Sequence, residues 1–384
     1  MGTVKTGLDM LLEEGCRTLR GLRVGLITNL TAVDCRLRPG IEVLADRPEV
    51  RLAAIFAPEH GLLGAIQAGD EVGDSRWGGL PVYSLYGPSR KPPGERLRGL
   101  DALVFDLPDA GARYYTFLYT MAYAMEAAAE AGIRFLVLDR PNPLNGITLD
   151  GNVLDPGYSS FVGLYPLPTR HGMTVGELAR LFHGCFGVGN PPEVIAMQGW
   201  RREMWFDHTG LPWVPPSPNL NCLEALTLYP GTCLLEGTNL SEGRGTALPF
   251  QVAGAPWIDG RAWARELNHL ALPGVIFRPA GFVPAFSKHA GAFCGGVQVH
   301  VTCREKLPGV EVGLHLIRTA MELWPGKLEW VPHRETGRPF IDLLAGTDGV
   351  RLALEQGRPV AEITAGWKDR LKAFVALRED YLLY

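Results

Sequence analysis

The sequence has 384 residues, 46% of them hydrophobic and 20% charged, with a formal net charge of −4 at pH 7. These values predict a globular chain with a large core and two domains, and they exclude an intrinsically disordered protein. The small negative charge offers no electrostatic basis for binding nucleic acid.

The distribution of cysteine and histidine argues against a metal site. Seven cysteines are scattered without a Cys-x-x-Cys pair, and the nine histidines show neither His-x-x-x-His nor His-Glu-x-x-His spacing. We therefore expect reduced thiols and no bound metal.

No apolar run reaches the roughly 18 residues of a membrane span, and the N-terminus has no basic-then-apolar leader. The sequence as given predicts a cytoplasmic protein, or a secreted one if a leader preceded it, and no oligomeric state is predicted.

The first part of the chain alternates short apolar strands with helices. Helices are predicted over 7–20, around 40–47, before Gly99 and over 114–131, the last ending at the C-cap Gly132. Strands are predicted over 23–29, 51–57, 81–86, 102–107 and 135–139, with 81–86 more polar and nearer an edge. This alternation predicts βαβ units and therefore an α/β fold with a doubly wound parallel sheet.

Polar or ionisable side chains follow each strongly apolar strand. The crossover rule places the carboxyl ends of these strands on one edge of the sheet, where α/β proteins bind ligands. The residues at these ends are Asn29, Glu59 with His60, Asp106 with Asp109 and Arg113, and Asp139 with Arg140. They predict a binding or catalytic site. Since neither Gly-x-Gly-x-x-Gly nor Gly-x-x-x-x-Gly-Lys-Ser/Thr occurs, no dinucleotide or nucleoside triphosphate cofactor is expected.

The strand at 51–57 leads into the most unusual of these ends. Pro58 interrupts the strand, Glu59 and His60 follow side by side, and Gly61 and Gly64 let the backbone bend. A carboxyl and an imidazole at a strand end are well placed for proton transfer. The alternative is an ordinary exit from a strand with two solvated polar groups.

The chain leaves the sheet at Arg140-Pro-Asn-Pro143, because two prolines in three residues extend neither a helix nor a central strand. We place a domain boundary shortly afterwards, which gives domains of residues 1–150 and 151–384. In the second domain a helix is predicted over 173–182, where Thr174 and Glu177 form a capping box.

Residues 231–246 are predicted to form a short apolar strand and then a glycine-rich polar loop. The loop carries Glu236, Asn239, Glu242 and Arg244, which is more polar groups than a simple turn needs. Backbone N–H groups together with Arg244 suit an anion or a sugar, and a solvated loop is the alternative. Ser287-Lys-His-Ala-Gly291 precedes a further strand over 296–302.

These segments together resemble the exo-β-N-acetylmuramidase family. The runs that carry the resemblance extend over nearly the whole chain and cover residues 56–61, 109–116, 139–143, 170–174, 216–219, 229–246 and 286–289. Two positions depart from the family pattern: Pro108 stands where Gln is usual, and Leu220-Asn221 stand where Met-Pro is usual. These departures bear on substrate preference more than on the reaction class.

The resemblance implies a glycosidase of cell-wall recycling that releases N-acetylmuramic acid from the non-reducing end of peptidoglycan-derived glycans. It also implies a Rossmann-like N-terminal domain, a smaller α+β C-terminal domain and a cleft between them, with Glu59 as the catalytic glutamate. A non-catalytic protein that binds amino sugars or muropeptides in the same cleft is the alternative. A carbohydrate esterase is disfavoured because no Gly-x-Ser-x-Gly motif occurs.

Glycoside hydrolysis needs a proton donor and usually a second carboxylate. We expect the catalytic groups to be Glu59, His60 and Asp109; Asp106, Glu236, Glu242 or the acetamido oxygen of the substrate are alternatives for the second role. The expected substrate-binding residues are Asn29, Asp106, Arg113, Asp139, Arg140, Asn219, Glu236, Asn239, Glu242, Arg244 and Lys288. Among the arginines, Arg244 is the first candidate to bind the lactyl carboxylate that distinguishes muramic acid from glucosamine.

Overall fold

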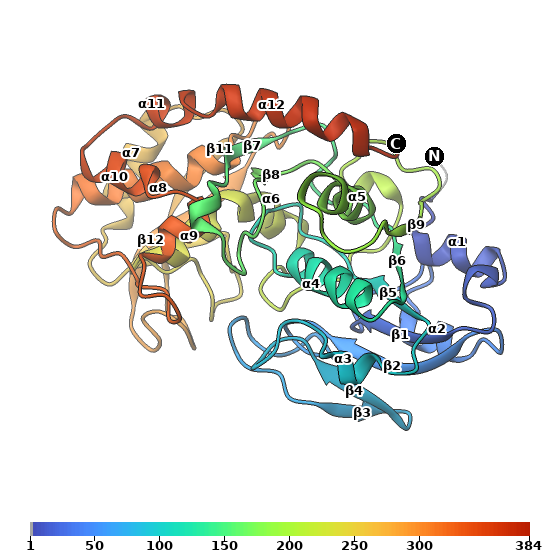
Figure 1. Ribbon diagram of the computed structural model, residues 1–384. Coiled ribbons are helices and arrows are strands. Elements are labelled where there is room, and N and C mark those ends of the chain that lie inside the picture. The colour runs from blue at the N-terminus through green and yellow to red at the C-terminus, as the bar shows by residue number, and fades with distance from the viewer. Residues whose placement is uncertain (1–2) are drawn as a thin grey trace.

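The computed structural model describes residues 3–384, and a seven-stranded sheet organises its N-terminal part (Figure 1). The strand order is β3-β4-β2-β1-β5-β6-β9, and every neighbouring pair is parallel except β3 with β4. The strands are β1 (Arg23–Thr28), β2 (Arg51–Ala57), β3 (Ser75–Trp77), β4 (Leu80–Ser84), β5 (Ala102–Asp106), β6 (Arg134–Leu138) and β9 (Glu193–Ile195). The predicted α/β fold with a parallel sheet is confirmed.

Helices cover both faces of this sheet. On one face lie α1 (Gly7–Glu13) and α2 (Gly40–Ala45), and on the other lie α4 (Phe117–Glu130) and α5 (Val175–Phe186), while α3 (Gly94–Leu97) follows β4. Successive side chains of a strand point to opposite faces. Leu26 therefore packs in the core under α1 and α2, whereas its neighbour Ile27 packs in the core under α4 and α5. This two-sided burial explains why the strands are apolar throughout.

The helix boundaries follow from local caps and from tertiary contacts. The capping box predicted at Thr174 is present, since its hydroxyl accepts from the Glu177 N–H at 3.3 Å and the Glu177 carboxylate accepts from the Thr174 N–H at 3.0 Å. The predicted helix at 114–131 begins only at Phe117, because Tyr114 and Tyr115 are buried in contacts with the C-terminal part. Gly132 adopts a left-handed φ of 67° just past the helix end, as expected for a C-cap glycine.

The C-terminal part combines two small antiparallel sheets with helices. The strands β7 (Asp150–Val153) and β8 (Pro168–Arg170) form a pair, and β10 (Val252–Ala255), β12 (Cys294–Val301) and β11 (Val275–Phe282) form a three-stranded sheet. The helices are α6 (Leu223–Thr232), α7 (Gly260–His269), α8 (Gly309–Leu323), α9 (Phe340–Ala345), α10 (Gly349–Glu355), α11 (Val360–Ala365) and α12 (Lys368–Arg378). Short 3-10 helices are η1 (Arg17–Leu19), η2 (Pro156–Tyr158), η3 (Phe206–Thr209), η4 (Cys233–Gly237) and η5 (Glu379–Tyr381).

Two features of the second half differ in place or type from the sequence prediction. The large sheet takes its last strand from β9, so the predicted boundary at residue 150 falls before the end of that sheet. The strand predicted from residue 231 is wrong, since α6 runs through Gly231 and continues into η4. A short apolar run does not distinguish a strand from a buried helix. This segment is a helix because α6 packs closely on α8, so closely that a Cβ at Gly231 would lie 1.9 Å from the Gly309 carbonyl oxygen.

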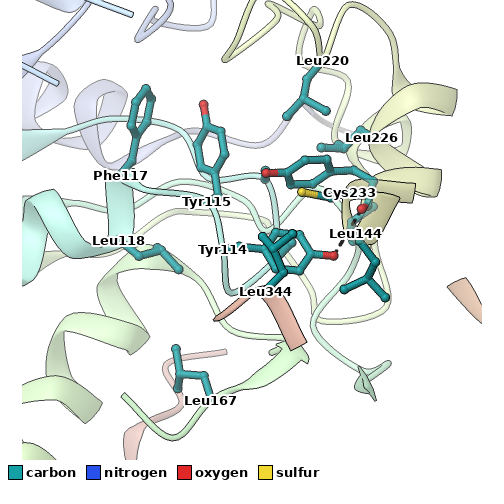
Figure 2. Close-up of a cluster of buried hydrophobic side chains, with 14 of the residues drawn as sticks. Tyr114, Tyr115, Phe117, Leu118, Leu144, Leu167, Leu220, Leu226, Cys233 and Leu344 are labelled. Atoms are coloured by element: carbon teal, nitrogen blue, oxygen red, sulfur yellow. Dashed lines mark hydrogen bonds between the residues drawn. The ribbon is translucent and has the colours of Figure 1, made fainter. Parts of the chain in front are cut away.

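A buried cluster joins the two parts (Figure 2). Tyr114 and Tyr115 come from the segment before α4, and they meet Leu220, Leu226, Cys233 and Leu344 of the C-terminal part. The Tyr114 hydroxyl donates to the Tyr229 carbonyl at 3.3 Å and also to the Pro230 carbonyl, and the Tyr115 hydroxyl donates to the Pro216 carbonyl at 2.8 Å. Apolar burial and polar contacts thus fix the two parts against each other.

Two further findings concern residues 3–384 as a whole. None of their helices is both long and apolar enough to cross a bilayer. All seven cysteines carry free thiols.

The close crossing of α6 and α8 generates a stability prediction. Gly231→Ala should destabilise the protein by about 1–3 kcal/mol, because the added methyl group forces two helix backbones apart. Gly94→Ala is the control, since Gly94 is helical and has no atom within 4 Å of an added Cβ. Urea unfolding of both variants measures the effect. Equal stabilities would mean that the crossing adjusts at no cost.

Candidate active site

A cleft of about 450 Å³ lies between the two parts of the molecule. One wall comes from the large-sheet part and contains Glu59, Tyr86, Arg90 and Thr116. The facing wall comes from the C-terminal part and contains Tyr229, Glu236, Glu242, Arg244, Lys288 and the loop 331–335. Tyr114 and Phe161 complete the lining with aromatic rings.

Glu59 follows the carboxyl end of β2, where the chain turns sharply. The turn needs left-handed backbone at His60, with φ of 72°, and at Gly61, with φ of 71°. One carboxylate oxygen of Glu59 accepts from the Gly69 N–H at 2.9 Å, and the other accepts from the Thr116 hydroxyl at 2.5 Å. Glu59 is only 6% exposed, so its carboxyl group is held in one orientation at the cleft wall.

Tyr86 stands beside this carboxyl group. Burial raises the pKa of the Tyr86 phenol, and the negative charge of Glu59 raises it further. The phenol therefore stays protonated and can donate a hydrogen bond. Tyr86 is a site residue that was not predicted from the sequence. A signal is present in the sequence, because Tyr86 ends the predicted strand 81–86, but this strand is less apolar than the strands whose ends predicted the site.

His60 supports the loop instead of facing the cleft. Its Nδ1 lies 2.7 Å from the Ile66 carbonyl oxygen, which can only accept, so Nδ1 carries the hydrogen. The ring meets the edge of Phe117 at a centroid distance of 6.3 Å. Burial lowers the pKa of the His60 imidazole and favours its neutral form. This contact closes the turn that positions Glu59.

The facing wall holds two cations and two carboxylates in one ion-pair network. Arg244 lies 2.7 Å from Glu236 and 3.4 Å from Glu242, and Lys288 lies 2.9 Å from Glu242. Lys288 also donates to the Leu235 and Leu240 carbonyls. Although burial opposes it, the charges of Lys288 and Arg244 lower the pKa of Glu242 and keep it ionised. All four side chains were predicted to bind substrate, and the structure brings them together at the cleft.

The residues at the other strand ends lie away from the cleft and form contacts within the protein. Arg140 donates to Asp106 at 2.7 Å and to the Val33 carbonyl at 2.9 Å. Asp139 accepts from Thr174, Gly176 and Tyr384, and Asn29 accepts from Thr31. Asp109 lies 3.2 Å from His171 and, with Arg140, lines a separate cavity of about 40 Å³ that the segment 211–214 covers.

Three further candidates also form structural contacts. Arg113 donates to the Asn152, Leu167 and Leu344 carbonyls, which lie 2.7–2.8 Å from its guanidinium nitrogens. Asn219 donates to Gln67 at 2.8 Å, and Asn239 donates to the Lys327 carbonyl at 2.9 Å. None of the three lines the cleft.

Within residues 3–384, no three His, Cys, Asp or Glu side chains are grouped so as to hold a metal ion.

A doubly wound sheet, a smaller α+β part, and a fixed glutamate that faces a carboxylate pair across a cleft are features of a two-part α/β glycosidase. Two family models match the chain: the N-terminal part of the exo-β-N-acetylmuramidase NamZ over residues 24–224 and the C-terminal part over residues 227–384. The chain therefore belongs to the NamZ exo-β-N-acetylmuramidase family, as the sequence resemblance implied.

Known relatives agree over the full length of the chain. The peptidoglycan β-N-acetylmuramidase NamZ of Bacillus subtilis is 48% identical over 383 residues, which cover 99% of this chain and 91% of that protein. Two crystal structures of DUF1343 family proteins from Bacteroides fragilis are similar in fold, with TM-scores of 0.90 and 0.80 at 37% and 32% identity. Each match covers 100% of this chain and 99% of the other.

The buried His60 generates a prediction about pH. Because its pKa is lowered in the folded state, the unfolded state binds the proton more tightly. Its contribution to stability is therefore complete above the ordinary histidine pKa of about 6.5 and falls as the pH drops below that value. Asn tolerates left-handed backbone, so His60→Asn removes the titration without straining the turn.

We expect the unfolding free energy of the wild type to fall, relative to that of His60→Asn, between about pH 7 and pH 5. Urea titrations across this range measure the difference. Parallel profiles for the two proteins would mean that His60 is equally protonated in the folded and unfolded states.

Proposed function

We propose that this protein hydrolyses the bond between a terminal N-acetylmuramoyl residue and the next sugar of a peptidoglycan-derived glycan, and that the cleft is where it does so. The observation that carries the proposal is Glu59, a nearly buried carboxyl group at the cleft wall with both oxygens fixed. Membership of the exo-β-N-acetylmuramidase family supports the choice of substrate.

In the proposed reaction Glu59 is the proton donor. It gives its proton to the glycosidic oxygen as the bond from that oxygen to the anomeric carbon breaks. Water then adds to the anomeric carbon through its oxygen and returns one proton to the Glu59 carboxylate. The Gly69 N–H and the Thr116 hydroxyl hold the carboxyl group in place. Orientation of this kind lowers the barrier because it is already present before the substrate binds.

A second carboxylate comes from the facing wall. Glu236 and Glu242 both line the cleft, but Glu242 is enclosed between Lys288 and Arg244 with a side chain only 2% exposed. The Glu236 side chain is 21% exposed and has one cationic partner, Arg244. We therefore propose that Glu236 stabilises the positive charge that develops at the anomeric carbon, either directly or by orienting the acetamido group of the substrate.

Replacing the proton donor tests the central assignment. Glu59→Gln should lower kcat on a chromogenic β-N-acetylmuramide by at least about 10²–10⁴-fold, because an amide cannot donate the proton to the leaving oxygen. The amide can still accept from the Gly69 N–H, so the thermal unfolding temperature should change little. Glu95→Gln, in exposed α3, is the control. A folded Glu59→Gln protein with near-normal kcat would remove Glu59 from this role.

The second carboxylate has its own test. Glu236→Gln should lower kcat by more than it raises KM, because the charge it stabilises exists only in the transition state. Steady-state kinetics on the same substrate separate the two constants. A rise in KM at unchanged kcat would assign Glu236 to binding alone.

A further inference from the structure

We propose that Arg90 binds the lactyl carboxylate of the terminal muramoyl residue, and that Glu335 occupies the same guanidinium until the substrate arrives. This inference rests on the proposed function and adds the residue that distinguishes muramic acid from glucosamine. Arg90 lies on the loop after β4, and Glu335 lies on the loop of the facing wall. Arg90 thus takes the role for which Arg244 was the first candidate from the sequence.

The position of Arg90 suits a residue that binds the lactyl group at C3 of the sugar. Its Cζ lies 5.9 Å from the ring centre of Tyr86, and Tyr86 stands beside Glu59. Arg90 is therefore one side chain away from the proposed proton donor. The lactyl group is attached at C3, two bonds around the ring from the anomeric carbon. A residue that binds the lactyl carboxylate must therefore lie near the proton donor but not against it, as Arg90 does.

The guanidinium of Arg90 is already oriented. It lies over the ring of Phe161, with its Cζ 4.5 Å from the ring centre. Contact with the aromatic ring restricts the movement of the guanidinium, whose intrinsically planar fork of N–H groups matches the two oxygens of a carboxylate. The side chain is 30% exposed and lines the cleft, so it is accessible to a ligand there.

The present partner of Arg90 is easily displaced. Within residues 3–384 its only hydrogen-bond and ion-pair partner is Glu335. The Glu335 side chain is 58% exposed and makes no other hydrogen bond within those residues. An exposed ion pair contributes little to stability, because the released carboxylate is solvated again by water. A substrate carboxylate can therefore take the place of the Glu335 carboxylate.

The other cations of the cleft are less suitable. Arg244 and Lys288 already balance Glu236 and Glu242, so a third carboxylate there would meet two like charges. Arg334 also lines the cleft but is exposed, and within the described residues it has no aromatic ring beneath it. Arg90 is the cation that combines an aromatic support with a replaceable partner.

Binding of the free sugars tests this assignment without any turnover. We expect wild-type protein to bind N-acetylmuramic acid more tightly than N-acetylglucosamine in calorimetry. Arg90→Ala should weaken the first by about 10- to 100-fold and leave the second unchanged, as expected for loss of a charge-assisted hydrogen bond. Arg90→Lys, which keeps the charge but loses the planar fork, should fall between the two.

A matched control is available in the same part of the chain. Arg96 lies over Tyr83 with its Cζ 4.3 Å from the ring centre, pairs with Asp74 at 3.5 Å, and does not line the cleft. Arg96→Ala should leave both sugar affinities unchanged. An equal loss for both sugars in Arg90→Ala would overturn the proposal, and so would a muramic-acid-specific loss in Arg334→Ala that Arg90→Ala does not show.

Removing the Glu335 carboxylate, which competes with the substrate for Arg90, should strengthen substrate binding where Arg90→Ala weakens it. Glu335→Gln should lower KM for a chromogenic β-N-acetylmuramide several-fold at unchanged kcat, because the lactyl contact is equally strong in the ground and transition states. A muramide whose lactyl carboxylate is esterified should bind wild type poorly and Arg90→Ala equally poorly. A rise in KM for the muramide in Glu335→Gln would mean that the Arg90–Glu335 pair is a structural contact and would overturn the proposal.

The two readouts separate this inference from the proposed function. Binding of N-acetylmuramic acid that depends on Arg90, without release of the chromophore from any muramide, would overturn the proposed hydrolysis and leave Arg90 as the carboxylate-binding residue. Hydrolysis of the muramide with no selective effect of Arg90→Ala would overturn Arg90 and leave the hydrolysis.

Discussion

A single buried arginine ties together the segments that form the cleft. Arg113 follows β5 and has no exposed surface, and its guanidinium donates to carbonyls at positions 152, 167 and 344. Burial lowers its pKa to about 10, so it remains charged at neutral pH. Burying a cation is costly unless hydrogen bonds compensate for the lost water, and here the two terminal nitrogens of the guanidinium make those bonds. The strand pair β7–β8 and α9 are therefore held against the loop that leads into α4, and that loop carries the tyrosines of Figure 2.

The geometry of the proposed proton donor follows from this junction. Thr116 binds one oxygen of Glu59 and lies three residues after Arg113, whose backbone carbonyl accepts from Tyr119 at 2.6 Å. The loop from β2 supplies the other donor, Gly69. The carboxyl group is thus fixed by two elements at once, whereas the opposite wall is fixed by its own charge balance. A cleft built in this way has a rigid acid on one side and a neutral ion-pair network on the other.

The parallel sheet could be predicted because its signals are local: each strand is a short apolar run, and each helix repeats its pattern within one segment. The use of each strand end could not be predicted in the same way. Asp106 and Asp139 find partners 34 and 245 residues away, and these distant residues decide whether a carboxylate faces a ligand or another side chain. Glu59 and His60 are adjacent in sequence, yet only Glu59 faces the cleft. Arg90 belongs to no motif, so only the fold brings it to the cleft.

Tyr384 returns to the first sheet, and this contact bears on how the chain folds. After α12 crosses the molecule (Figure 1), the Tyr384 hydroxyl donates to the Asp139 carboxylate at 2.7 Å and accepts from the Met197 N–H at 2.6 Å. During synthesis on the ribosome, the large sheet emerges long before this tyrosine. The buried Asp139 therefore lacks one of its hydrogen-bond partners until a further 245 residues have been synthesised. Contacts of such long range slow folding, so the N-terminal part completes its native packing only with the help of a residue 245 positions further along the chain.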